Sequence, residues 1–183
     1  MSSLHVGNAG EHYAMACLLA RGFHVGLADR GNPHFDLLMR APDGTFRAVR
    51  VKTTSGDDFK WTAKDEWEPL PGFNSASPDP LDMTILVAFN GKPPGAATEV
   101  YVIPTARLVA DINRVQRHYY QHKNLDGSDR TRTKMRIVRL GGTVRPGNIA
   151  YGFKEDWREF RDAWHLLEGG ASASAPSARH AAE

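Results

Sequence analysis

Apolar residues recur with helical spacing near the start of the chain. They fall at Ala9, Tyr13, Ala16, Cys17 and Ala20. This stripe predicts a helix from about residue 9 to about residue 21. Asn8 and Glu11 predict its first turn, because each side chain can accept a hydrogen bond from the other residue's free backbone N–H. Gly22 is expected just past the end of the helix, where a positive φ favours glycine.

Five short segments rich in apolar and β-branched residues predict strands. They cover residues 23–27, 35–39, 45–54, 83–89 and 100–103. The turn sequence at 41–44, Ala-Pro-Asp-Gly, joins the second and third segments into a hairpin. The fourth segment is almost continuously apolar and is therefore expected at the centre of a sheet. Residues 135–140 have the pattern of a short strand or a helical turn.

Two further helices are predicted in the second half, over about 105–122 and over 156–168. Their apolar residues at helical spacing are Leu108, Val109, Ile112, Val115 and Tyr119, and then Trp157, Phe160, Trp164 and Leu167. The order of elements predicts an α/β fold in which helices flank a mixed sheet of four or five strands. One domain over 1–169 is expected, with an acidic, proline-rich loop at 56–82 and a disordered Ala/Ser-rich tail at 170–183.

Composition narrows the class of protein. The chain has 183 residues, of which 41% are hydrophobic and 24% charged, as in an ordinary globular domain and unlike a disordered or fibrous chain. Its longest apolar run, 13–20, is far shorter than the about 20 residues that cross a bilayer. Cys17 is the only cysteine, so an internal disulfide and a multi-cysteine zinc site are excluded. With no secretory signal in the first residues, we expect an intracellular, cytoplasmic protein.

Charge is uneven along the chain, although the net charge is only +2. Residues 57–82 carry a local charge of −5, and residues 105–162 carry +6. The basic half fits a polyanionic partner such as nucleic acid. A solvated helix surface explains the same pattern equally well. Charge alone therefore does not choose between these two interpretations.

Three polar residues stand out by their positions. Asp36 interrupts an apolar strand, Lys52 ends the next strand, and Glu11 lies on the first helix. Hairpin geometry places Asp36 opposite Arg50 or Val51, with Lys52 close by. Carboxylates at one end of a sheet can hold a divalent cation, and a neighbouring lysine can orient water and offset the charge that gathers on phosphorus. This combination is typical of metal-dependent cleavage of phosphodiester bonds.

Four short motifs contain these residues. They are Gly7-Asn8-Ala9-Gly10-Glu11, Leu18-Leu19-Ala20-Arg21-Gly22-Phe23, Phe35-Asp36-Leu37-Leu38 and Val49-Arg50-Val51-Lys52-Thr53. In their order and spacing, the motifs resemble the PD-(D/E)XK nuclease superfamily, and within it the small single-domain endonuclease-like proteins. The resemblance implies a restriction-endonuclease-like fold, a Mg²⁺ or Mn²⁺ cofactor and a nucleic-acid substrate, DNA in the first place. A homodimer is compatible with this function, because cleavage of both strands often uses two sites.

Roles for individual residues follow from the resemblance. Asp36 matches the central metal-binding aspartate, and Glu11 matches a helix glutamate that assists metal binding. Lys52 matches the catalytic lysine, and the backbone carbonyl of Val51 would be a further metal ligand. Thr53, next to the lysine, is expected to contact nucleic acid together with Arg50.

Arg50 departs from the family, which has Glu or Gln at this position. A guanidinium has five donors and no acceptor, so it cannot ligate a metal. At about 5 Å from a dication, with an effective dielectric of about 20, it would be repelled by roughly 7 kcal/mol before screening. Three arrangements stay open. Arg50 swings away and binds phosphate; or a carboxylate of Asp57 or Asp58 replaces the missing ligand; or Arg50 pairs with Asp36, and the protein is a degenerate nuclease that binds nucleic acid or a protein without cutting.

Each candidate also has a plain structural explanation. A capping role alone would explain Glu11, and an ion pair alone would explain Asp36. Lys52 could be an ordinary lysine at the end of a strand. His118 and His122 share a predicted helix face, but no third ligand follows, and a solvated pair is expected rather than a zinc site.

Overall fold

The chain forms two helices and seven strands within the part that the structure, a computed structural model, describes: residues 2–29, 32, 35–62, 83–124, 126–141 and 153–168. In chain order these elements are α1 (Ser3–Leu19), β1 (His24–Leu27), β2 (Leu37–Arg40), β3 (Phe46–Thr54), β4 (Asp58–Thr62), β5 (Met83–Ala88), β6 (Glu99–Pro104), α2 (Thr105–Gln121) and β7 (Met135–Arg139). Two 3₁₀ turns, Arg158–Phe160 and Trp164–Leu167, follow. No helix among these residues has the length and apolar character that a membrane crossing needs.

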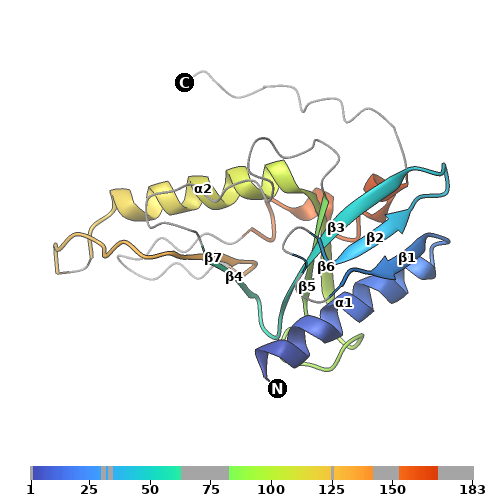
Figure 1. Cartoon of the computed structure of the whole chain (residues 1–183). Coiled ribbons are helices and arrows are strands. Elements are labelled where there is room, and N and C mark those ends of the chain that lie inside the picture. The colour runs from blue at the N-terminus through green and yellow to red at the C-terminus, as the bar shows by residue number, and fades with distance from the viewer. Residues whose placement is uncertain are drawn as a thin grey trace.

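Five strands form one mixed sheet in the order β1-β2-β3-β5-β6. β3 and β5 run parallel, and the other neighbouring pairs are antiparallel. The strands β4 and β7 pair with each other as a separate antiparallel ribbon, which extends away from the main sheet alongside α2 (Figure 1). The predicted α/β fold, in which helices flank a mixed sheet of four or five strands, is confirmed, and the sheet has five strands.

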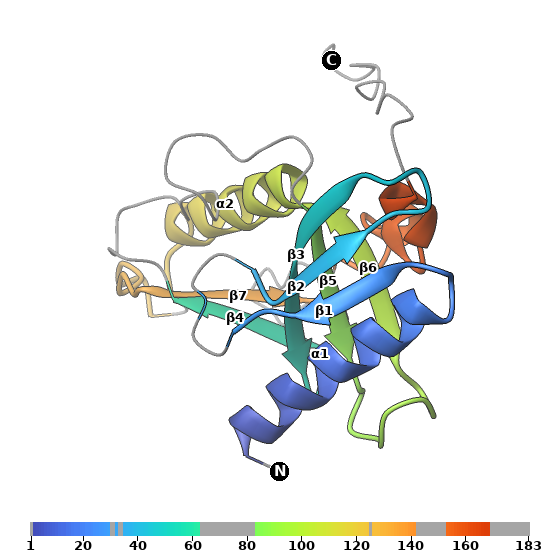
Figure 2. The ribbon, with the colours of Figure 1, turned by 45° about the vertical axis from the view of Figure 1, so that its right-hand side comes forward.

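The main sheet buries apolar side chains on both faces, because side chains alternate along each strand. In β5, Ile85 belongs to a hydrophobic cluster with α1, whereas Leu86 belongs to a second cluster with α2 and the β4–β7 ribbon. α1 and α2 therefore cover opposite faces of the sheet (Figure 2). In β3, Val51 belongs to the first cluster, so the side chain of Lys52 points to the face that carries α2.

The first helix begins earlier than its sequence pattern predicts. The Ser2 hydroxyl caps α1 by accepting a hydrogen bond from the His5 N–H. Asn8 and Glu11 lie inside the helix, and the predicted capping box is therefore wrong. The added turn carries Val6, which is buried against the sheet, so packing extends the helix past the local capping signal.

The end of α1 and the hairpin turn agree with the sequence. Gly22 follows the helix with a φ of +85°, and Gly44 closes the turn between β2 and β3 with a φ of +89°. Both values lie in the left-handed region, where glycine is favoured. The hairpin pairs β2 with β3 in the register Leu37 to Val49.

Part of the predicted acidic loop is a strand. Residues 58–62 form β4, with Phe59 and Trp61 buried and Lys60 exposed between them. Alternation of buried and exposed residues with a period of two is typical of a half-buried strand. Here the alternation covers only a few residues, so it is a weak signal. Residues 63–82 of that predicted loop and the predicted tail, 170–183, lie outside the described residues.

The predicted helix at 156–168 is wrong, although its aromatic residues are buried. The chain instead forms two 3₁₀ turns separated by an extended residue, Arg161, which pairs with Tyr101 of β6. Asp162 has a φ of +51°, which breaks helical geometry. Backbone pairing with the sheet edge therefore overrides the helical spacing of Trp157, Phe160 and Trp164.

Candidate active site

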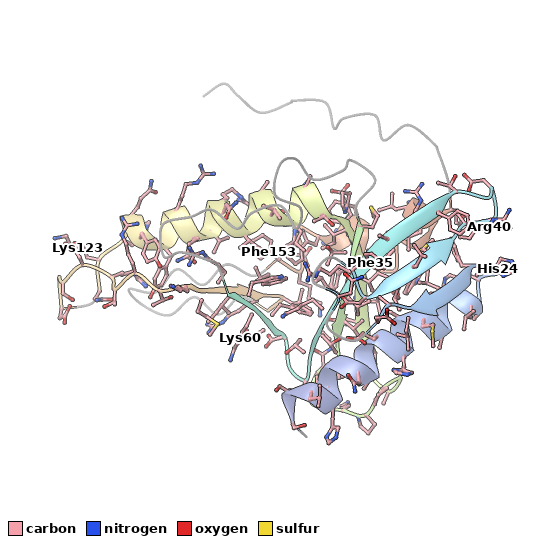
Figure 3. All side chains as sticks on the ribbon, viewed as in Figure 1. His24, Phe35, Arg40, Lys60, Lys123 and Phe153 are labelled. Carbon is pink, nitrogen blue, oxygen red and sulfur yellow. The ribbon has the colours of Figure 1, made fainter. Side chains whose placement is uncertain are left out.

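An open edge of β3 marks the candidate site. Residues 46–49 of β3 pair with β2, whereas residues 49–54 pair with β5 on the other side. Beyond Val49, no strand in the described ranges pairs with β3 on the β2 side. Asp36 lies at this point, one residue before β2, and its N–H donates to the Val49 carbonyl at 3.1 Å. Figure 3 labels Phe35, the residue before Asp36, in the middle of the molecule.

The Asp36 carboxylate continues the hydrogen bonding where the strand pairing stops. The Val51 N–H donates to Asp36 Oδ2 at 2.7 Å, a distance typical of a charge-assisted hydrogen bond. In an extended strand, the N–H and C=O of one residue point to the same side. The Val51 carbonyl therefore also faces the open edge. Asp36 and Val51 thus offer a carboxylate and a carbonyl oxygen in one place.

Lys52 follows Val51 and lies on the α2 face of the sheet. Its side chain is half-buried, and its Nζ lies 5.9 Å from the centroid of the Trp61 ring in β4. Burial lowers the pKa of the Lys52 ammonium, the positive charge of Arg50 lowers it further, and the Asp36 carboxylate raises it. The structure therefore brings Asp36, Arg50 and Lys52 within electrostatic reach of one another.

A close contact between α1 and β3 carries Glu11 toward the same end of the sheet. A Cβ placed on Gly10 would lie only 1.8 Å from Thr53 Oγ1, so glycine is required for the helix to approach the strand this closely. Glu11 is the next residue of α1 and is half-buried. The Thr53 hydroxyl points at α1, and its Oγ1 is buried without a hydrogen-bond partner in the described part of the chain.

The oxygen donors at this edge fit a small, hard divalent cation. Mg²⁺ is commonly bound by one or two carboxylates and completes its coordination with water and substrate phosphate oxygens. Asp36 supplies one carboxylate beside the Val51 carbonyl, and Glu11 carries another on α1. No cluster of three or more His, Cys, Asp or Glu side chains suited to a metal occurs in the residues that the structure describes. The donor set therefore fits an ion shared with substrate rather than one caged by protein.

The acidic residues that follow β3 belong to the ribbon. Asp58 forms an ion pair with Arg139 of β7, with a closest distance of 3.1 Å. Asp57 is exposed, and its Oδ2 lies 2.9 Å from the position that a Cβ on Gly141 would occupy. Asp58 is therefore already engaged, which disfavours it as the replacement for a missing metal ligand.

Arg50 is separated from the first turn of α2 by strand β5. Its register partner in β5 is Thr84. The hydroxyl of Thr84 is 2.9 Å from that of Thr105, the first residue of α2, and both threonines are buried. This bond fixes the start of α2 against the sheet, one strand away from Arg50.

Trp61 packs beside Lys52 in this part of the site. It faces Lys52 because β4 leaves β3 and then pairs with β7, so Trp61 enters the second hydrophobic cluster. The alternation of Phe59 and Trp61 in the sequence was the signal that could have placed it on a strand.

His118 and His122 lie next to each other on α2, with their ring planes tilted by 36°. Their ring centroids are 4.1 Å apart, and the His122 ring Nδ1 is 2.9 Å from the His118 carbonyl. Burial and the neighbouring His122 lower the pKa of His118. No third metal-binding side chain joins them among the described residues.

Comparisons with known proteins give similarities among solved structures. No family model matches the chain, and no curated protein matches it. Among solved structures, the chain is similar to the bacterial homing endonuclease I-Ssp6803I, with 13% sequence identity, a TM-score of 0.48 and 91% of each chain covered. The function proposed below rests on the residues of the site and not on this similarity.

Proposed function

We propose that this protein is a metal-dependent nuclease that hydrolyses phosphodiester bonds in DNA. One observation carries the proposal. At the open edge of β3, the Asp36 carboxylate is held by the Val51 N–H, and the half-buried Lys52, the next residue of the strand, is close enough to interact electrostatically with that carboxylate. In metal-dependent phosphodiester hydrolysis, such oxygen ligands hold the ion, and a nearby cation stabilises the charge that develops on the phosphoryl oxygens.

Asp36, Glu11 and the Val51 carbonyl would hold a Mg²⁺ or Mn²⁺ ion. When bound, such an ion polarises a phosphoryl oxygen and lowers the pKa of a water molecule. The hydrogen bond from Val51 to Oδ2 restrains the Asp36 carboxylate, which leaves its other oxygen with a defined direction. A pre-oriented ligand of this kind avoids reorganisation during the reaction.

Lys52 would act on the attacking water and on the phosphate. Because its pKa is lowered, a larger fraction of this lysine is neutral at a given pH than of an exposed lysine, and only the neutral amine can accept a proton. The resulting ammonium offsets the negative charge that develops on phosphorus. The Trp61 ring, whose centroid lies 5.9 Å from Lys52 Nζ, keeps water away from one side of this amine.

Nucleic-acid binding without cleavage is a second candidate function, and Arg50 favours it. Arg50 is close enough to Lys52 to lower its pKa, so two cations share this part of the sheet. Two cations attract a phosphate and repel a metal dication. Arg50 could grip a phosphate with two parallel hydrogen bonds, which is useful for binding whether or not the bond is then cut.

A cleavage assay separates these two functions. Plasmid and single-stranded DNA are incubated with Mg²⁺ or Mn²⁺ and with the parent protein, Lys52→Ala or Arg50→Gln. We expect cleavage by the parent and none by Lys52→Ala, with both proteins melting at similar temperatures. A silent parent and an active Arg50→Gln would instead support the binding protein. Cleavage that persists in Lys52→Ala would refute the assignment of this site.

Thermal melting in a metal titration tests the cation directly. A ligand at 100 times its dissociation constant stabilises the folded state by about 2.7 kcal/mol. We expect Mg²⁺ or Mn²⁺ to raise the melting temperature of the parent and not that of Asp36→Asn, in which the amide can still accept the Val51 hydrogen bond. Asp58→Asn, which removes a carboxylate of the ribbon, is the matched control and should keep the shift.

A further inference from the structure

The second half of α2, the loop after it and β7 form a basic arm, which we define as residues 114–139. Eight Lys or Arg residues in this segment stand against two Asp, which gives a local charge of +6. The eight are Arg114, Arg117, Lys123, Arg130, Arg132, Lys134, Arg136 and Arg139. None of them belongs to the candidate site, so the chemistry proposed there does not account for this charge.

Most of this charge is on the surface of the arm. Arg117, Lys123, Arg132 and Lys134 are exposed, whereas Arg136 is buried. Lys123 lies 3.7 Å from an Asp129 carboxylate oxygen, but both side chains are well exposed. An ion pair of this kind contributes little and is easily exchanged for another anion. The arm therefore presents a positive field to an approaching partner.

Aromatic contacts and hydrogen bonds hold the loop of the arm against α2. The Arg130 guanidinium lies 4.2 Å from the centroid of the Tyr119 ring, and that of Arg132 lies 5.0 Å from the Tyr120 ring. The Tyr120 hydroxyl also accepts a hydrogen bond from the Thr133 N–H at 2.9 Å. These contacts fix the positions of the charges, which reduces the entropy lost when a partner binds.

The arm leads away from the candidate site along α2. The helix begins at Thr105, which is bonded to the register partner of Arg50. Its 17 residues make it about 25 Å long at 1.5 Å per residue. Lys123, just past its end, lies far from Phe35 in the view of Figure 3. A DNA duplex rises 3.4 Å per base pair, so this length corresponds to about seven base pairs.

The basic residues of α2 lie away from its buried side. Arg114 and Arg117 are three residues apart and share one face of the helix. Leu108 and Ile112, which pack into the second hydrophobic cluster, lie on the other side. Arg114 is ion-paired with Asp111 at 3.3 Å and with Asp156 at 3.4 Å. On α2, a phosphate backbone would therefore meet Arg117 and then reach the loop of the arm.

We propose that the basic arm binds the phosphate backbone of duplex DNA and so places a phosphodiester bond at the candidate site. The choice of DNA rests on the proposed function, whereas the binding surface rests on the charge and geometry of the arm. Lys and Arg contacts to phosphates supply sequence-independent affinity and fix the register of a protein on its duplex. The bound length extends about seven base pairs to one side of the cleaved bond.

Binding without cleavage tests this proposal. A fluorescent duplex is titrated in EDTA, and anisotropy gives the dissociation constant at several salt concentrations. Arg117→Ala, Lys123→Ala and Arg132→Ala are combined in one variant. The matched control combines Arg21→Ala, Lys92→Ala and Arg158→Ala, which are exposed residues outside the arm. Both variants lose three positive charges, so a difference between them reports position and not net charge.

We expect the arm variant to bind at least about tenfold more weakly than the control variant. The slope of the logarithm of its association constant against the logarithm of salt concentration should become shallower by about 0.9 for each phosphate contact removed. Equal binding by the two variants, with both folded by circular dichroism, would overturn the proposal. Tighter binding of an RNA duplex, with the same dependence on the arm, would overturn the choice of DNA.

The outcome is independent of the nuclease assay. If the parent does not cleave DNA but the arm variant alone loses binding, the nuclease proposal is refuted and DNA binding by the basic arm is supported. If the parent cleaves DNA and the arm variant binds as the control does, the nuclease proposal is supported and DNA binding by the basic arm is refuted.

Discussion

Replacement of Gly10 by alanine measures how closely α1 must approach β3. The new Cβ would lie 1.8 Å from Thr53 Oγ1, 2.5 Å from Thr53 Cγ2 and 2.6 Å from Thr53 Cβ. Rotation about χ1 of Thr53 can move Oγ1 and Cγ2 away, but Cβ is fixed to the strand. Carbon atoms in contact are about 3.5–4 Å apart. α1 must therefore move away from β3 by about 1 Å, whichever rotamer Thr53 adopts.

The size of the effect follows from two opposing contributions. Alanine is favoured over glycine inside a helix by about 1 kcal/mol. Overpacking that forces the backbone to shift costs about 1–3 kcal/mol, occasionally more, and a clash with a fixed strand atom belongs at the upper end. We expect Gly10→Ala to lower the free energy of unfolding by about 2 kcal/mol. For a chain of this size, that is a fall of roughly 4–8 °C in melting temperature.

Calorimetry on two alanine variants of the same helix makes the test. A Cβ on Gly7 meets nothing within 4 Å, so Gly7→Ala should gain about 1 kcal/mol from helix propensity alone. Adding Thr53→Ala to Gly10→Ala removes two of the three clashing atoms and should restore part of the lost stability. If Gly10→Ala melts at or above the parent temperature, as Gly7→Ala does, the close approach of α1 to β3 is refuted. On the proposed function, the displaced helix also carries Glu11 away and lowers cleavage.

Two further predictions concern buried charges. Burial and Arg50 lower the pKa of Lys52 in the folded protein. The unfolded chain therefore holds this proton more tightly. As a result, the free energy of unfolding rises with pH between the pKa of the folded state and that of the unfolded state. Lys52→Met should therefore be more stable than the parent at pH 7 in denaturant unfolding, by a margin that shrinks toward about pH 10; a constant margin would contradict this. Asp111 accepts hydrogen bonds from Trp157 Nε1 at 2.9 Å and Arg107 Nε at 2.8 Å. Asp111→Ala orphans the buried indole N–H and should cost about 3 kcal/mol in thermal unfolding, whereas Asp111→Asn keeps an acceptor and should cost less; equal losses would count against the bond.

The main sheet could be predicted because its segments carry strong local signals. The apolar run at 83–89 marks a central strand, and the turn ending at Gly44 defines the hairpin. The start of α1 could not be predicted in the same way. Asn8 and Glu11 have the spacing of a capping box, but such residues also occur inside helices, and the burial of Val6 against the sheet decides where the helix begins.

The elements that were missed depend on contacts between distant segments. β4 is a strand because it pairs with β7, far along the chain. Five alternating residues do not predict which distant segment they will pair with. The aromatic residues of 157–167 have helical spacing, but Arg161 pairs with Tyr101 and interrupts the helix. Local periodicity records which side chains are buried, and here it does so correctly without giving the backbone conformation.

The pairing of Asp36 with the end of β3 could be predicted because hairpin register is set by the turn. Its detail could not, since Asp36 lies just before β2 and its carboxylate, rather than its backbone, bonds Val51. The position of Trp61 beside Lys52 was also hidden, because it depends on the fold of the ribbon.

The two proposals together give a physical reason for an arginine at position 50. Thr84 and Thr105 fix the start of α2 one strand away from it, so Arg50 lies near the first turn of the helix whose second half opens the basic arm. A cation there continues the positive surface up to the open edge of β3, where the proposed reaction needs a phosphate. A carboxylate in its place would help a metal but would repel that phosphate. Arg50→Gln should therefore weaken duplex binding in EDTA; unchanged binding would show that the positive surface ends before the candidate site.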